Sequence, residues 1–414
     1  MNLISYAARN VLRNRRRSAL AVLSVFLSIL MIVVLRGFAD GFLDSIVKNY
    51  IKNETGHINI ATEAFRGRSR FLPVDEYIED SSALAGTIAP ALEKVVPGAI
   101  VAERSRFGVL LSSDRGTKEA LALAGDPQVE RRLLMLDRSI MAGGTYLSGP
   151  GQAIVGAGIA ADLGLKQGGQ LKLVAQKADG GLGFKRLAIV GIFRTGVNDL
   201  DGSLLQMGLE DSRDLLGMEG GAQQLAIVLP DRTRLGPAMD AVRKAVLDSG
   251  RQGLSIVPWT AIGEYPKLVT LMEVVYDWVY LVVGFLGAFI IANVMMMVVL
   301  ERRREIGILM SMGMPKKRIL GIFLLEGTIL GFIGSITGVA AGWAFNLFFS
   351  RHGFDMTSAM AGFSWPLDNI IYPSVGVGPL LAGLLVGTTV SAIVAYFPSR
   401  RAASMAPVEA IRGQ

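Results

Sequence analysis

Four long apolar runs constrain this chain more than any other feature. The transmembrane helices that they predict span residues 18–36, 276–300, 319–349 and 375–397. Each run reaches, or nearly reaches, the roughly 20 residues that an α-helix needs to cross a bilayer. The first run follows basic residues, as in a cleaved signal peptide, but its apolar core is too long and no cleavage motif follows it. We therefore expect a membrane protein with four transmembrane α-helices.

The distribution of charge predicts the orientation of these helices. The chain carries 42 lysines and arginines and a net charge of +7. Fourteen of these cations lie before the first span, in residues 301–318, or after the fourth span. Short loops rich in Lys and Arg stay on the cytoplasmic side of a membrane. We expect both termini and residues 301–318 to be cytoplasmic, and residues 37–275 and the loop 350–374 to be extracytoplasmic.

The remaining segments divide as follows. Residues 1–17 read as a cytoplasmic amphipathic helix, and residues 398–414 as a cytoplasmic tail. Residues 37–275 alternate helical and strand patterns, which predicts a large α+β domain with a β-rich insert at about 100–220. The basic charge is not interleaved with stacking aromatic residues, so membrane lipids are expected partners and nucleic acid is not.

Residues 301–318, between the second and third spans, begin with five charged residues and end with three cations. Ile306, Leu309, Met310 and Gly313 fall on one side of a helix, and Pro315 is expected to end it. Such a helix could rest on anionic lipid or dock a soluble partner. We favour docking, because methionine adapts to a concave surface and Glu305 could pair with an arginine across it.

The sequence offers no catalytic or metal site. Cysteine is absent, and no Gly-Lys dipeptide occurs, so the chain has no phosphate-binding P-loop. The two histidines, His57 and His352, are expected to be structural or solvated. Residues 153–161 match a dinucleotide-binding pattern, with Asp179 as the acidic residue. The helix that could follow is too short for a βαβ crossover, which favours a strand, a turn and a short helix.

Two features lie inside the third span. Five glycines recur on one helix face and predict close helix packing, although glycine is also common in membrane helices generally. These are Gly327, Gly331, Gly334, Gly338 and Gly342. Glu326 is the one acid in the third span, which makes it a functional candidate. We favour a structural ion pair with a basic residue near the cytoplasmic interface.

These pieces resemble the permease subunits of bacterial ABC transporters of the lipoprotein-releasing and macrolide-exporter type, and the FtsX-like cell-division permeases. The most specific part is Glu301-Arg302-Arg303-Arg304-Glu305-Ile306-Gly307 through Met312-Gly313-Met314, which is similar to the coupling helix of that family. Residues 398–403 and 407–412 also match it, and residues 55–58, 125–127 and 192–196 point to the lipoprotein-releasing branch.

The resemblance implies a non-catalytic subunit in the bacterial inner membrane that works by mechanotransmission. Two such chains, or one chain and a paralogue, would bind two ABC ATPase subunits, and those ATPases would bind ATP and Mg. Their strokes would extract or release a lipoprotein or another amphiphile from the outer leaflet. The alternative is an FtsX-like signalling permease that drives an extracytoplasmic partner without transport. Recruitment of a periplasmic carrier stays open, because the hairpin at residues 176–186 is short and glycine-rich.

Two sets of residues follow from this resemblance. The ATPase-coupling set is Glu301, Arg304, Glu305, Gly307, Leu309, Met310, Met312, Gly313 and Met314. The substrate-facing set lies on the first two spans, where an acyl chain could enter laterally, although ordinary packing or lipid contact would need the same residue types. It comprises Leu27, Leu30, Met31, Val34, Phe38, Val279, Val283, Leu286 and Phe289.

Overall fold

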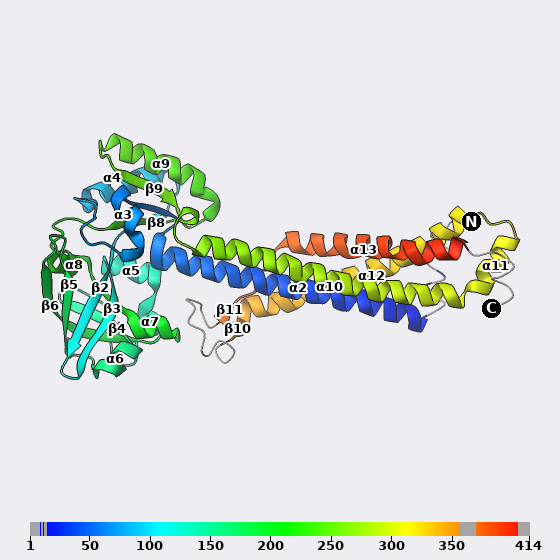
Figure 1. Cartoon of the computed structure of the whole chain (residues 1–414), viewed down its shortest axis with the longest axis horizontal. Helices are drawn as coiled ribbons and strands as arrows, with labels where there is room; N and C mark the ends of the chain where they lie inside the picture. The colour runs from blue at the N-terminus through cyan, green and yellow to red at the C-terminus, as the bar shows by residue number, and fades with distance from the viewer. Residues whose placement is uncertain (1–8, 10, 12–14, 357–369, 405–414) are drawn as a thin grey trace. The chain divides into compact units, whose positions relative to one another are not determined.

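The computed structural model describes residues 9, 11, 15–356 and 370–404 (Figure 1). The expected amphipathic helix 1–17 lies almost entirely outside the described residues, as do much of the loop 350–374 and the end of the tail. The chain forms two compact units. The helical unit comprises Met1–Asp44, Thr270–Asp355 and Ile370–Gln414, and the large domain comprises Ser45–Val269 and Met356–Asn369.

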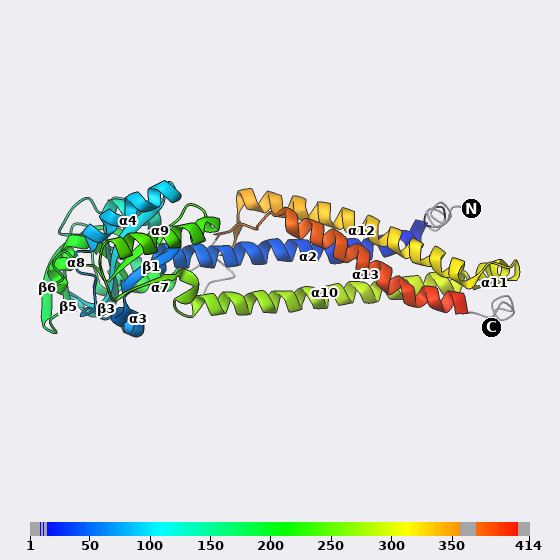
Figure 2. The same ribbon diagram turned by 90° about the horizontal axis from the view of Figure 1, so that it is seen from above.

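The expected four-helix membrane architecture is confirmed, because four helices are long and apolar enough to cross a bilayer (Figures 1 and 2). They are α2 (Arg15–Tyr50), α10 (Tyr265–Glu301), α12 (Lys316–His352) and α13 (Val377–Ser404). Each helix exceeds its predicted span, and α10 and α12 have 37 residues each, or about 55 Å at 1.5 Å per residue. The first seven residues of the expected tail belong to α13.

The five glycines of α12 line its contacts with two neighbouring helices. All five are buried: Gly327, Gly331, Gly334, Gly338 and Gly342. A Cβ added to Gly338 would lie 2.8 Å from the backbone oxygen of Phe26 in α2. A Cβ added to Gly331 would overlap Ser391 in α13. Glycine therefore sets how closely α2 and α13 approach α12.

The large domain is built on a nine-stranded mixed sheet. Its strands are β1 (Ile58–Thr62), β2 (Ile100–Ser113), β3 (Gly116–Gly125), β4 (Gln152–Gly156), β5 (Gln170–Gln176), β6 (Leu182–Phe193), β7 (Leu204–Gly208), β8 (Gln224–Val228) and β9 (Leu254–Pro258). Its helices are α3 (Glu63–Arg68), α4 (Ser81–Val95), α5 (Pro127–Leu134), α6 (Ala157–Leu163), α7 (Asn198–Ser203), α8 (Leu209–Leu216) and α9 (Leu235–Asp248).

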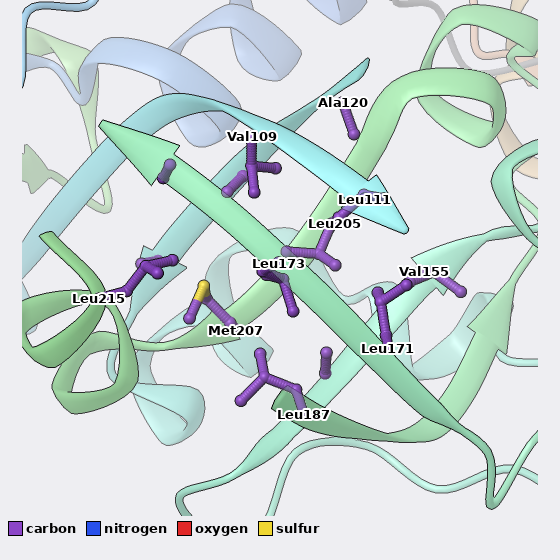
Figure 3. Close-up of a cluster of buried hydrophobic side chains, with 14 of the residues drawn as sticks. Val109, Leu111, Ala120, Val155, Leu171, Leu173, Leu187, Leu205, Met207 and Leu215 are labelled. Carbon is purple, nitrogen blue, oxygen red and sulfur yellow. The ribbon is translucent and has the colours of Figure 1, made fainter. Parts of the chain in front are cut away.

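The expected β-rich insert is a closed ring of strands. The order is β3-β7-β4-β6-β5-β2-β8-β1-β9, and β2 also pairs with β3. Strands β2 to β7 therefore close into a ring, with one core of residues between Phe107 and Met218 inside it (Figure 3). A second core packs α4 and α9 against β1 and β8. The insert is joined to this outer part through β2, so the two share a continuous sheet.

The dinucleotide-like pattern folds as the expected strand, turn and short helix. Strand β4 leads directly into α6, which has seven residues and ends at Gly164 with φ of 63°. A Cβ on Gly158 would lie 2.9 Å from the backbone oxygen of Asp201, and one on Gly156 would overlap the same atom. These two glycines therefore let the junction of β4 and α6 approach Asp201 in α7.

Candidate functional site

The candidate coupling segment forms a short helix and a tight corner. Helix α11 covers Arg303–Ser311 and is separated from α10 by Arg302, whose ψ of 11° is not helical. The helix ends in a Schellman motif, in which the N–H of Met314 donates to the carbonyl of Leu309 at 3.1 Å. Gly313, with φ of 86°, occupies the left-handed position that this motif needs.

The expectation that Pro315 ends this helix is wrong. Pro315 is the residue before the first turn of α12, where its φ of −70° suits a helix start. Lys316, Lys317 and Arg318 therefore belong to the first turn of α12. Glycine, with its freedom to adopt positive φ, stops α11 three residues earlier than the proline would have done.

The inner face of α11 packs on the ends of three long helices. We call this packing the α11 cluster. It contains Val298, Val299, Ile306, Ile319, Phe323, Ala402 and Ala403, with Met310, Met314 and Leu320 packed against it. Of the expected coupling residues, Met310 and Met314 are partly buried against this cluster and Gly307 is buried, so they contribute to the inner face of α11. Helix α11 is therefore attached to α10, α12 and α13 together.

The outer face of α11 carries an exposed row of side chains, which we call the docking stripe: Arg304, Glu305, Ile308 and Met312. Arg304, Ile308 and Met312 follow one another at spacing four, so they share one helix side. Ile308 is 48% exposed and Met312 79% exposed. The sequence analysis missed Ile308, which its position midway between Arg304 and Met312 could have revealed. Glu301 and Gly313 are also exposed, and Leu309 is partly buried.

Arg302 connects α11 to α12 from a buried position. Its Nε donates to Glu305 at 2.9 Å and its Nη1 donates to Glu326 at 3.3 Å. The side chains of Arg302 and Glu326 are 8% and 4% exposed. The guanidinium also lies 5.7 Å from the centre of the Phe323 ring. The ion pair expected for Glu326 is confirmed, and Arg302 is a site residue that the sequence analysis did not single out.

The expected substrate-facing residues lie on several sides of their helices. Leu27, Met31, Leu286 and Phe289 are exposed, as is Val279, while Leu30, Val34 and Val283 are partly buried. Between α2 and α10, a Cβ on Gly287 would lie 2.5 Å from Ser28 Oγ, and Arg36 pairs with Asp277 at 3.2 Å.

Phe38, the last residue of α2 in that set, packs beside aromatic residues of α12 and the segment after it. Its ring lies 6.4 Å from Phe345, 6.2 Å from Phe349 and 5.3 Å from Phe354. It belongs to an aromatic cluster with α12 and the segment that follows α12, so it does not line the seam between α2 and α10. Aromatic rings pair at such separations, and helical periodicity alone cannot show which neighbour a ring will find.

The described residues contain no group of three His, Asp or Glu side chains that could hold a metal ion. The buried charged residues of the helical unit are instead used in the Arg302 network.

Known proteins match the chain over both units. The MacB-like periplasmic core domain matches residues 18–245, and the FtsX-like permease C-terminal domain matches residues 279–407. An uncharacterized ABC transporter permease of Methanocaldococcus jannaschii is 28% identical over 239 residues, which cover 56% of each chain. This chain thus spans little more than half of that relative's length.

Two further relatives extend the match. The lipoprotein-releasing system transmembrane protein LolC of Neisseria meningitidis serogroup B is 25% identical over 74% of this chain and 79% of its own. The macrolide export ATP-binding/permease protein MacB of Rhodopirellula baltica is 31% identical over 36% of this chain and 19% of its own. The MacB-like periplasmic core domain alone matches more than half of this chain. The chain therefore belongs to the family of ABC transporter permeases that carry a MacB-like periplasmic core domain and an FtsX-like C-terminal domain.

Proposed function

We propose that this chain couples ATP hydrolysis by a separate ABC ATPase to the movement of its own membrane helices. The observation that carries the proposal is the two-sided packing of α11. Its inner face is fixed to α10, α12 and α13 through the α11 cluster, while its outer face leaves the docking stripe exposed. A force on the stripe would therefore reach three helices at once.

Arg302 would make this attachment rigid. Because it pairs with Glu305 on α11 and with Glu326 on α12, tilting α11 away from α12 would separate buried opposite charges. In this proposal two ATPase subunits, which bind ATP and Mg, close on the stripes of two permease chains. The membrane helices then shift as a group, and both termini and α11 face the cytoplasm.

The proposed substrate is a lipoprotein or another amphiphile in the outer leaflet of a bacterial inner membrane. The relative from Neisseria meningitidis is named for lipoprotein release. Leu286 and Phe289 of α10 and Leu27 and Met31 of α2 expose large apolar side chains, which suit acyl chains. Such a substrate would enter from the bilayer beside these two helices.

The test uses the full chain co-purified with its ABC ATPase in lipid nanodiscs. Ile308→Glu and Met312→Glu place a charge on the docking stripe, away from the α11 cluster. We expect each to reduce ATP hydrolysis by the complex about tenfold or more, because burying an unpaired charge at a contact costs several kcal/mol.

Phe71→Glu is the matched control, because Phe71 is 83% exposed and lies in the large domain. It should leave hydrolysis unchanged. Full hydrolysis by Ile308→Glu together with Met312→Glu would remove α11 from the coupling mechanism. ATP-driven movement without release of a bound lipoprotein would instead favour a signalling permease.

A further inference from the structure

The large domain contains a pocket that is separate from its two main cores. A cavity of about 200 Å³ opens beside the end of α2 and the start of α10. Its floor is a third apolar cluster, built from β3, α5, α7, β7 and the turn after α5. Six leucines of that cluster line the cavity: Leu121, Leu123, Leu134, Leu136, Leu200 and Leu204. The floor is thus aliphatic and comes from five segments.

The mouth of the pocket is polar but carries no net charge. Glu54 and Arg106 are the charged residues among those that line it, and Arg106 Nη1 lies 3.4 Å from Glu54 Oε2. Asn49, Asn53, Ser139 and Thr195 supply uncharged polar side chains, and two tyrosines, Tyr50 and Tyr265, also line the pocket. Because the one cation at the mouth is already paired, the pocket offers little to attract a phosphate or a carboxylate.

The walls of the mouth are held in place by specific contacts. On one side, Tyr50 donates to the carbonyl of Ile262 at 2.7 Å, and its ring lies 4.7 Å from that of Tyr265. On the other side, both the N–H and the hydroxyl of Thr195 donate to Asp201, at 2.8 and 2.9 Å. A pocket that is formed in advance loses less free energy on binding than one that must be ordered.

The geometry points to a binding site for the end of an aliphatic chain of an uncharged or zwitterionic amphiphile. The chain end lies among the six leucines, and the part of the chain nearer the polar head leaves through the mouth beside Asn49, Asn53 and Thr195. A cavity of about 200 Å³ has room for only part of one acyl chain. The site therefore takes a chain terminus, and the rest of the chain stays outside it.

This inference deepens the proposed function, on which it rests for the source of the chain. The diacylglyceryl cysteine of a lipoprotein is uncharged once its α-amino group is acylated, as it is in the peptide used to test this site, and a zwitterionic phospholipid offers the same chain chemistry. We expect the lipoprotein to be the preferred source, so that the large domain holds one end of a substrate chain.

The experiment uses the full chain in nanodiscs of phosphatidylethanolamine and phosphatidylglycerol, without ATP. The probe is a synthetic N-acylated diacylglyceryl-cysteine peptide with a diazirine near the end of one acyl chain. After irradiation and trypsin digestion, label is expected in residues 119–131, 133–138 and 195–213, which carry the six leucines. A phosphatidylethanolamine and a fatty acid with the same diazirine form the comparison arms, and the fatty acid should label least.

Two variants fill the pocket, Leu200→Trp and Leu134→Trp. Each should lower labelling about tenfold, because excluding roughly two methylene groups costs about that factor in affinity. Leu182→Trp is the control, since Leu182 is 63% exposed on β6 and does not line the pocket. Circular dichroism of each variant confirms that the chain is folded.

Equal labelling of wild type and both pocket variants, or no label in the three peptides, would overturn the inference. Stronger labelling by phosphatidylethanolamine than by the lipopeptide would uphold the chemistry and assign the site to membrane lipid. The result is separable from the coupling function. Met312→Glu should keep full labelling while it loses ATP hydrolysis, so the pocket and the coupling function can each fail without the other.

Discussion

At the residue scale, Arg302 shows how a single buried cation can organise a membrane protein. Moving an ion out of water costs several kcal/mol, and only good geometry with opposite charges offsets that cost. Glu305 and Glu326 provide those charges on two different helices. The sequence could indicate that Glu326 needs a basic partner. It could not select Arg302, because three arginines stand in a row and only the break after α10 turns this one inward.

We predict that Glu326→Gln lowers the free energy of unfolding by about 3 kcal/mol, because Arg302 then stays buried with only the half-exposed Glu305. Unfolding in detergent, followed by circular dichroism, measures the loss. The double variant Arg302→Met with Glu326→Met should recover most of it, since apolar residues can replace a buried ion pair. Glu264→Gln, which breaks an exposed pair with Lys267, serves as the control. Equal stability of Glu326→Gln and that control would contradict this account.

His57 gives the large domain a predictable response to acid. Burial, with a smaller contribution from Arg232, lowers the pKa of His57 from 6.5 to about 4. Its Nδ1 accepts a hydrogen bond from the N–H of Leu229 at 3.0 Å, which suits the neutral ring. Between those two pKa values the unfolded chain binds a proton that the folded chain does not, so stability falls as the pH is lowered from about 6.5 to about 4.

The check is the midpoint of thermal unfolding of the full chain, measured from pH 7.5 down to pH 4. His57→Asn keeps an acceptor for the N–H of Leu229 but cannot be protonated in this range. We expect the variant to lose less stability than wild type across the interval. Parallel curves for the two proteins would show that His57 contributes nothing to the acid response.

At the scale of elements, the repeated glycines of α12 form one helix face, and α2 and α13 pack closely against it. Gly338→Leu would push α2 away from α12, and we expect a loss of roughly 1–3 kcal/mol by overpacking. Gly321 lies in the same helix with no atom near the place of its Cβ. Gly321→Ala should therefore be neutral or stabilising, because glycine is a poor helix former. Chemical unfolding of both variants measures the contrast, and equal effects would mean that α12 has no close packing face.

Some elements could be predicted from the sequence and others could not, for physical reasons. Strands β5 and β9 and helix α9 follow clear apolar patterns between turns. Strand β2 does not show one continuous apolar alternation in the sequence, because Arg104 and Ser105 interrupt it. Arg104 is buried and paired with Glu130 at 2.6 Å, and local sequence cannot reveal a partner 26 residues away. Strand β8, buried between β1 and β2, was missed because such a short strand has no exposed polar face to create a period.

The sequence indicated which segment could contact a partner, but not which side chains of that segment point outward. The residues of the expected coupling set lie on and beside α11, and their role in coupling stays a prediction. Met310 and Met314 pack partly against the α11 cluster, and Gly313 and Pro315 turn the chain between α11 and α12. The side of α11 that is exposed depends on the directions of α10, α12 and α13, and those directions are set by contacts distant in the sequence.

At the scale of the whole molecule, the orientation in the membrane stays a prediction from charge. The chain contains no cysteine, so single-cysteine variants can be labelled without background. Phe71→Cys in the large domain should react with an impermeant maleimide in intact spheroplasts. Met312→Cys on α11 should react only after the membrane is opened. The reverse pattern would place α11 on the side without ATP and would remove its proposed role.

The central claim is that ATP used by a partner moves the membrane helices through α11. Spin labels at Trp278 of α10 and Val377 of α13, both exposed, report on that movement by pulsed electron paramagnetic resonance of the complex in nanodiscs. We predict that ATP with Mg changes the distance between the labels in wild type, and that Met312→Glu abolishes the change. A wild-type distance that ignores ATP, or the same change in Met312→Glu, would contradict the account.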